Sequence, residues 1–140
     1  MWLFIHLTIA YWATLLPINR FKNDNWLFTP KKFETTKFYE NILYVKKWKH
    51  LLPDGAALFK KGFRKKRIMT KQKDYLEIFL IETRRGEFTH WFVILFSPIF
   101  FVWNPLIFGL VNIAYALVAN IPCIIVQRYN RLRFENLLKD

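Results

Sequence analysis

The chain has 140 residues, enough for one domain, and is 54% hydrophobic with a formal net charge of +12. A soluble globular protein does not usually combine these values, and separated apolar and basic blocks favour a membrane protein with charged cytoplasmic parts. A nucleic-acid binder, the other strongly basic class, would not explain why residues 88–127 contain no Asp, Glu, Lys or Arg. With a single cysteine, Cys123, an intrachain disulfide is excluded.

The first segment, residues 1–19, has no formally charged side chain. Its length is close to the roughly 20 residues that a helix needs to cross a bilayer. We therefore predict a retained transmembrane anchor over Trp2 to Leu16. A cleaved signal peptide is the alternative, although it would carry a positive region ahead of its apolar core.

The second segment, residues 20–87, is strongly basic, and 16 of the 22 Lys and Arg residues lie between Arg20 and Lys73. Apolar residues recur at helical spacing from Phe38 to Leu52, which predicts an amphipathic helix lying on anionic lipid. The sequence "PDG" ends this helix as a turn, and the run "KKGFRKKR" predicts a lipid-facing or phosphate-binding surface. A further helix is expected from about Gln72.

The third segment, residues 88–127, would be about 60 Å long as one straight helix, twice the thickness of the roughly 30 Å hydrocarbon core. It is therefore predicted to form a hairpin that crosses twice. Asn104 and Pro105 in "WNP" suit a helix start, so we expect helices over about 88–103 and 105–126. The fourth segment, residues 128–140, is a basic tail.

The distribution of Lys and Arg predicts how the chain lies in the membrane. The middle segment and the tail are rich in both residues, whereas the "WNP" turn has neither, so the basic parts are expected in the cytoplasm. The sequence thus predicts an all-α, multi-pass cell-membrane protein with an N-terminal anchor, cytoplasmic amphipathic and basic helices, and a C-terminal transmembrane hairpin.

Polar side chains stand immediately before the uncharged hairpin, in "ETRRGEFTHW". Glu87 and His90 are i,i+3 neighbours on one helix face, where a carboxylate can orient an imidazole for general-base catalysis. The same spacing occurs in Glu-x-x-His metal sites. The alternative is an interfacial helix end, in which Arg84 pairs with Glu87 and His90 lies among lipid headgroups.

The hairpin returns to the side it left, so a second polar cluster is expected near the first. This cluster contains Arg128, Asn130 and Arg131. Polar residues within the returning helix, Asn112, Tyr115 and Asn120, indicate either a functional site or hydrogen bonds between helices. A separate motif, His50 to Gly55, matches the His-x-x-x-Asp-Gly pattern of the large soluble CoA-dependent acyltransferases, whose length excludes a shared fold.

Four stretches taken together resemble a known family. They are "YVKKWKHLLPDG", "IETRRGEFTHW", "NIAYALVANIP" and "VQRYNRLR", in this order between about Leu43 and Leu138. They are similar to glycosyl-4,4'-diaponeurosporenoate acyltransferase of staphyloxanthin biosynthesis. The resemblance implies a small membrane acyltransferase that esterifies a hydroxyl of a glycosylated carotenoid, or a similar lipid-linked sugar, with a fatty acyl chain. It supplies no set of catalytic residues.

Acyl transfer to a hydroxyl needs a base and groups that stabilise the oxyanion. His90 oriented by Glu87 is the favoured base, and His50 with Asp54 is the alternative. Ser97, the only serine, and Cys123 lie within predicted crossings, which favours direct transfer over a covalent acyl-enzyme.

The substrate-binding residues are expected to be Arg84, Arg128, Asn130 and Arg131, whose side chains suit the phosphates of acyl-CoA or an acyl-lipid headgroup. We expect no cofactor. The expected partners are anionic lipid, an acyl donor and a lipid-linked acceptor, but not nucleic acid, and a homo-oligomer remains open.

Two other functions remain open from the sequence. One is a non-catalytic membrane scaffold or lipid-binding protein that acts through its basic face. The other is a metal-dependent membrane lipid enzyme with Glu87, His90 and His50 as ligands.

Overall fold

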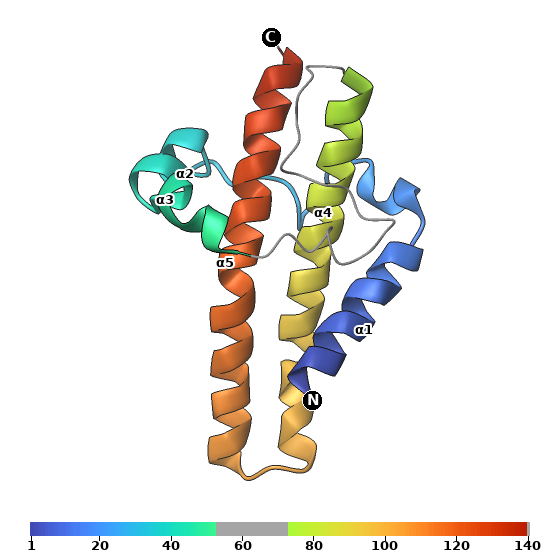
Figure 1. Cartoon of the computed structure of the whole chain (residues 1–140), viewed down its shortest axis with the longest axis vertical. Helices are drawn as coiled ribbons and strands as arrows, with labels where there is room; N and C mark the ends of the chain where they lie inside the picture. The colour runs from blue at the N-terminus through green and yellow to red at the C-terminus, as the bar shows by residue number, and fades with distance from the viewer. Residues whose placement is uncertain (53–72, 140) are drawn as a thin grey trace.

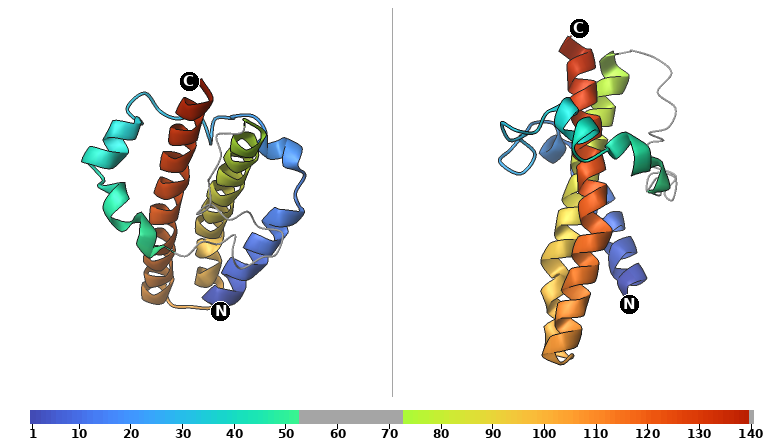
Figure 2. Two further views of the ribbon diagram at one scale, coloured as in Figure 1. Left: turned by 45° about the horizontal axis from the view of Figure 1, so that its top comes forward. Right: turned by 90° about the vertical axis from the view of Figure 1, so that its left-hand side faces the viewer.

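The computed structural model describes residues 1–52 and 73–139, and all regular secondary structure in these ranges is helical. Two long antiparallel helices, α4 (Lys73–Phe96) and α5 (Leu106–Lys139), form a hairpin (Figure 1). Helix α1 (Trp2–Leu15) lies along α4, whereas the short helices α2 (Thr36–Asn41) and α3 (Val45–Trp48) lie beside α5 (Figures 1 and 2). The predicted all-α class is confirmed.

The hairpin turns at the predicted "WNP" sequence. Helix α4 passes into a 3₁₀ helix, η4 (Ser97–Val102), and α5 begins directly after Pro105. Pro98 lies at the start of η4, and because proline has no N–H it interrupts the α-helical hydrogen bonds and favours this change. The side-chain amide of Asn104 donates to the Phe100 carbonyl (2.9 Å), which ties the turn to the helix before it.

The second hairpin helix is longer than predicted. The sequence placed its end near Val126, but α5 continues through the basic tail to Lys139 and contains Pro122 in its interior. The tail "QRYNRLRFENLLK" is rich in residues of good helix propensity, and Phe134 packs against Phe79 of α4 with ring centroids 4.3 Å apart. This contact stabilises the part of α5 that follows Val126, so the helix continues through the charged residues of the tail.

The amphipathic helix predicted over Phe38 to Leu52 is not continuous, which corrects the sequence analysis. It is divided into α2, α3 and a 3₁₀ turn, η2 (Lys49–Leu51), and Tyr44 between α2 and α3 has a left-handed backbone (φ 50°). In an unbroken helix Tyr39 and Val45 would lie about 120° apart around the axis. The break lets both side chains bury against Tyr129 of α5, and this packing outweighs the helical pattern.

Helix α1 forms where the sequence predicts an apolar anchor, and it packs through its aromatic residues. The Trp2 indole N–H donates to the Asn112 side chain of α5 (2.7 Å). Trp12 stacks beside Phe92 of α4 with centroids 5.2 Å apart. With 14 residues α1 is about 21 Å long, which is shorter than the hydrocarbon core.

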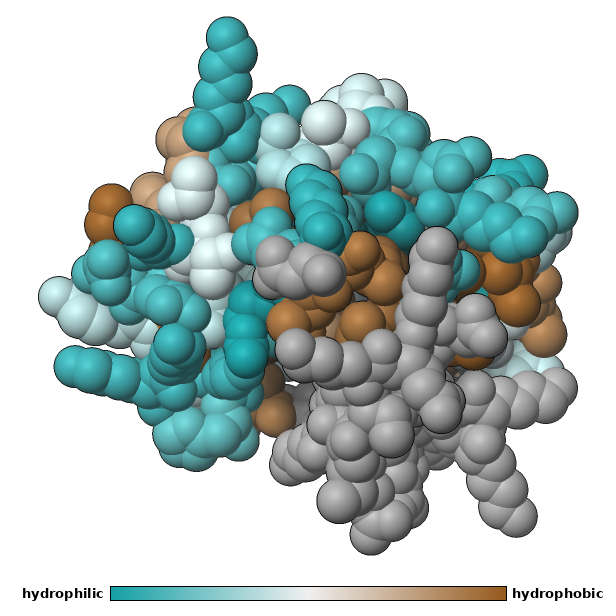
Figure 3. All heavy atoms as spheres, turned by 90° about the horizontal axis from the view of Figure 1, so that it is seen from above, coloured by the Kyte–Doolittle hydropathy of each residue, from teal (hydrophilic) through white to brown (hydrophobic). Residues whose placement is uncertain are grey.

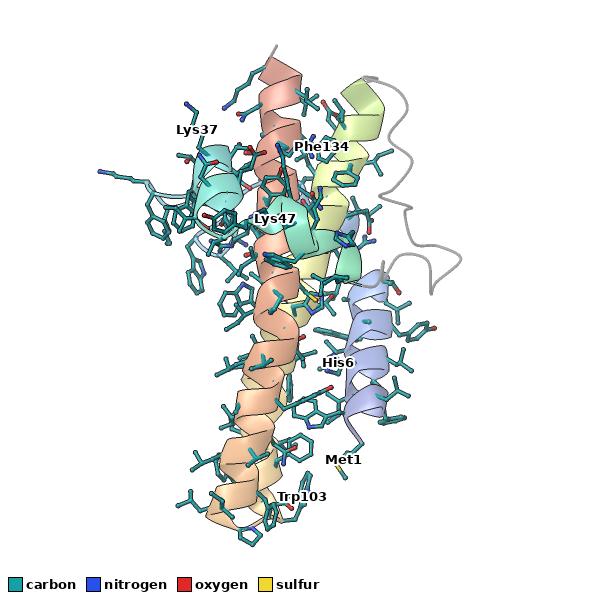
Figure 4. All side chains as sticks on the ribbon, turned by 60° about the vertical axis from the view of Figure 1, so that its left-hand side comes forward. Met1, His6, Lys37, Lys47, Trp103 and Phe134 are labelled. Atoms are coloured by element: carbon teal, nitrogen blue, oxygen red, sulfur yellow. The ribbon has the colours of Figure 1, made fainter. Side chains whose placement is uncertain are left out.

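Polar and apolar residues are separated along the long axis of the molecule. The end at which α4 begins and α5 finishes has a largely hydrophilic surface (Figure 3), and Lys37 and Lys47 lie toward it, whereas Met1 and Trp103 lie toward the other end (Figure 4). Near that other end large apolar side chains of α5, such as Leu106 and Val118, are 70% and 76% exposed. Among the described residues, α5 is the one helix long and apolar enough to cross a membrane.

We expect Gly109→Ala to destabilise the hairpin. A Cβ atom at Gly109 would lie 2.1 Å from the Phe101 ring, so the ring or the turn must move. Overpacking of this kind costs about 1–3 kcal/mol, which exceeds the roughly 1 kcal/mol that alanine gains over glycine in a helix. The free energy of unfolding, measured by circular dichroism in detergent, should fall.

Gly86→Ala is the matched control for this prediction. There the new Cβ would meet only the amide end of Gln127, at 2.7 Å, which is flexible and can move aside. A Gly109→Ala protein that is as stable as Gly86→Ala, or more so, would show that the Phe101 ring does not require the glycine.

Candidate active site

The buried carboxylate of Glu87 lies at the centre of the contact between α4 and α5. Its side chain is fully buried, and it forms ion pairs with Arg128 (Nε to Oε1, 2.7 Å) and Arg131 (Nη1 to Oε2, 2.8 Å). The Trp91 indole N–H also donates to Oε1 (3.2 Å). The expectation that the two polar clusters lie close together across the hairpin is therefore confirmed.

The same two arginines hold the N-terminal segment against the hairpin. Arg128 pairs with Glu34 (2.7 Å) and donates to the Leu27 carbonyl (2.6 Å). Arg131 donates to the Phe28 carbonyl (2.9 Å). Each guanidinium thus joins helix α4 to the irregular chain between η1 (Ile18–Phe21) and α2.

Arg84 has a similar role one turn earlier on α4. It is buried, pairs with Asp24 (2.8 Å) and Glu135 (3.6 Å), and donates to the carbonyls of Phe21 and Lys22. Arg84, Arg128 and Arg131 were expected to bind substrate phosphates. In the structure each of the three guanidinium groups pairs with carboxylates and carbonyls of this chain, and phosphate binding by these residues stays a prediction.

Glu34 is the acidic member of this network contributed by the N-terminal segment. It accepts hydrogen bonds from the Tyr39 hydroxyl (2.6 Å) and from the Lys31 backbone N–H. Burial by itself would raise the pKa of this carboxyl, but these two donors and Arg128 outweigh it and leave the pKa below its ordinary value. Glu34 therefore stays ionised and keeps its pairing with Arg128 at neutral pH.

His90 lies on α4 one turn beyond Glu87, and it contacts a residue of the facing helix α5. Its Nδ1 atom is 2.8 Å from Oδ1 of Asn120, a fully buried residue of α5. The Asn120 amide nitrogen donates in turn to the Ala116 carbonyl (2.8 Å). The carboxylate of Glu87 is engaged with arginines, and it is Asn120 that faces the imidazole Nδ1.

The remaining predicted residues fall at separate places. His50 is exposed in η2, Asn130 is partly buried on α5, and Asp54 lies outside the described residues. Within residues 1–52 and 73–139, no three His, Cys, Asp or Glu side chains form a group that could hold a metal ion. His50 is therefore not assembled with Glu87 and His90, as the metal-enzyme alternative required.

Sequence reasoning missed two kinds of residue at this site. Asn120 was noted only as a polar residue within a crossing, and its pairing with His90 depends on the register of the hairpin. Asp24 and Glu34 were not assigned any role. Their signal was that the chain has only three carboxylates before residue 53, at Asp24, Glu34 and Glu40, and a carboxylate is the natural partner for a buried arginine.

Comparisons with known proteins agree with the resemblance seen in the sequence. A family model described as glycosyl-4,4'-diaponeurosporenoate acyltransferase matches residues 24–140. Two relatives with this name, from Staphylococcus aureus strains bovine RF122 / ET3-1 and MRSA252, are each 40% identical over 139 residues. The alignments cover 99% of this chain and 84% of each relative. No solved structure matches the chain.

We expect Glu87→Leu to destabilise the protein strongly. It leaves Arg131 fully buried without its carboxylate, and removing one partner of a buried pair costs about 3–5 kcal/mol. Unfolding in detergent, followed by circular dichroism, should show this loss. Lys46→Met is the control: Lys46 pairs with Glu40 while 58% exposed, so its loss should cost less than about 1 kcal/mol. Equal effects of the two substitutions would contradict the central role of Glu87.

Proposed function

The chain belongs to the glycosyl-4,4'-diaponeurosporenoate acyltransferase family and is an acyltransferase, and from this premise we propose that it esterifies a hydroxyl of a glycosylated carotenoid, or a similar lipid-linked sugar, with a fatty acyl chain. The observation that carries this proposal is the 40% identity over 99% of the chain to relatives named for that acyl transfer. The acyl donor is an acyl-CoA or an acyl lipid, and the protein needs no resident cofactor.

His90 is the general base in this proposal. It is a partly buried imidazole on the rigid helix α4, and its Nδ1 is held by Asn120. An imidazole fixed in this way can take a proton at one nitrogen without turning, which is the requirement for a positioned base. His50, the alternative base, is exposed in η2.

The reaction is a direct transfer. The acceptor hydroxyl oxygen attacks the acyl carbonyl carbon while His90 takes its proton, so the new ester C–O bond forms. The bond between the acyl carbon and the donor's leaving atom then breaks, and the leaving group takes the proton from His90. The imidazole ends neutral, as it began, and no acyl-enzyme forms.

The reaction takes place at a membrane in this proposal. Only 22% of the most apolar stretch of α5 is buried within the protein, so most of that surface is available to lipid. An apolar hollow between α1 and the end of α4 adds to this surface, and its lining residues are Phe4, Ile5, Thr8, Ile9, Phe96 and Ile99. Acyl chains and a carotenoid acceptor would reach the hairpin from the bilayer, with the basic end of the molecule at anionic headgroups.

Three crossings with a cytoplasmic basic segment complete the proposal. The hairpin contributes two crossings, and α1 contributes the third. Because α1 is only about 21 Å long and lies at an angle to α4 (Figure 1), this crossing requires the bilayer to thin around it. The hydrophilic end of the molecule supports a position at the membrane surface, with the apolar part of the hairpin in the bilayer. The positive-inside rule favours an orientation with the Lys- and Arg-rich end in the cytoplasm.

We expect His90→Ala to abolish acyl transfer while leaving the protein folded. Loss of a general base lowers kcat by about 10²- to 10⁴-fold. The measurement is ester formation on a glycosylated carotenoid in membranes, with helical content checked by circular dichroism. His50→Ala is the matched control and should keep its activity. An active His90→Ala protein together with an inactive His50→Ala protein would move the base to the "HLLPDG" motif.

The topology has a separate test. Single cysteines placed at Lys47 and at Asn104, in a Cys123→Ser background, should react with a membrane-impermeant thiol reagent from opposite sides of the membrane. The reason is that Lys47 lies toward the basic end of the molecule, whereas Asn104 lies in the hairpin turn. Labelling of both positions from the same side would exclude a membrane-spanning hairpin.

A further inference from the structure

The orientation of the Asn120 amide is determined by its surroundings. Its nitrogen lies 2.8 Å from the Ala116 carbonyl oxygen, and a carbonyl can only accept a hydrogen bond. A rotated amide would place two oxygen atoms against each other in a fully buried position. The atom that faces His90 is therefore Oδ1, which is an acceptor.

This orientation has a consequence for the imidazole. An acceptor 2.8 Å from Nδ1 requires that Nδ1 carries the proton. In the neutral ring only one nitrogen is protonated, so the lone pair is on Nε2. His90 has a further interaction besides this bond, and the acceptor oxygen at Nδ1 favours the tautomer with the proton on Nδ1.

We propose that Asn120 is the positioning residue for His90, holding the tautomer in which Nε2 receives the proton of the acceptor hydroxyl. This rests on the proposed function, in which His90 is the base. Histidine bases in serine and cysteine hydrolases are held in the same tautomer by an Asp or Asn that accepts a hydrogen bond from Nδ1. Here the hydrogen-bond acceptor is Oδ1 of Asn120, which reaches His90 from the facing helix α5.

Asn112 provides a matched control on the same helix. Its amide nitrogen also donates to the carbonyl four residues earlier, that of Phe108 (2.8 Å), and its Oδ1 also accepts an N–H, from the Trp2 indole (2.7 Å). The two asparagines thus share a hydrogen-bond pattern, but Asn120 is fully buried, Asn112 is partly exposed, and each holds a different ring. Replacing Asn112 disturbs packing between α1 and α5 but leaves the imidazole alone.

The test compares Asn120→Leu, Asn120→Asp and Asn112→Leu in the full chain, reconstituted in lipid. With ¹⁵N-labelled histidine, the neutral His90 ring should show its proton on Nδ1, with the signal identified by its absence in His90→Gln. In Asn120→Leu the proton should move toward Nε2, and kcat should fall at least about tenfold with little change in KM. Asn120→Asp keeps an acceptor oxygen and should retain the Nδ1–H signal and more activity than Asn120→Leu.

The outcomes separate this inference from the proposed function. An active His90→Ala protein would overturn the assignment of the base. An inactive His90→Ala protein, with Asn120→Leu matching Asn112→Leu in both kcat and tautomer, would overturn the role of Asn120 alone. If Asn120→Leu does not fold, the wild-type spectrum still decides, because a proton on Nε2 of neutral His90 would contradict the proposal.

Discussion

The fold depends on one buried carboxylate shared by two arginines. Glu87 on α4 meets Arg128 and Arg131 on α5 at 2.7 and 2.8 Å. A charge in such a place is strongly disfavoured without its partners, so the two helices are held in the register that keeps all three together. Because Arg128 and Arg131 also bind the segment around Phe28 and Glu34, the same interaction orders the N-terminal part of the chain.

The contact between His90 and Asn120 depends on this register. His90 lies one turn beyond Glu87 on α4, and Asn120 lies about two turns back from Arg128 on α5. Gly86 lets the side chain of Gln127 approach α4 closely at the same level. The ion pairs of Glu87 fix the position of α4 relative to α5. Because His90 and Asn120 are on these two helices, their contact is fixed as well.

Three arginines at the hairpin form ion pairs within the chain. Arginines beside a membrane readily suggest phosphate binding, and Arg84, Arg128 and Arg131 were assigned that role from sequence. Their partners within the chain are Asp24, Glu34, Glu87 and Glu135, together with backbone carbonyls, and phosphate binding stays a prediction.

The sequence by itself determined the elements that depend on local pattern. The 40 residues without Asp, Glu, Lys or Arg and the "WNP" break predicted the hairpin and its turn, and four short stretches indicated the family. Only the tertiary structure decided the pairings. Three features depend on side chains that are distant in sequence: the carboxylates that pair with Arg128, the break at Tyr44, and the contact of Asn120 with His90. These contacts form when the helices pack, and the spacing of residues along one helix does not determine them.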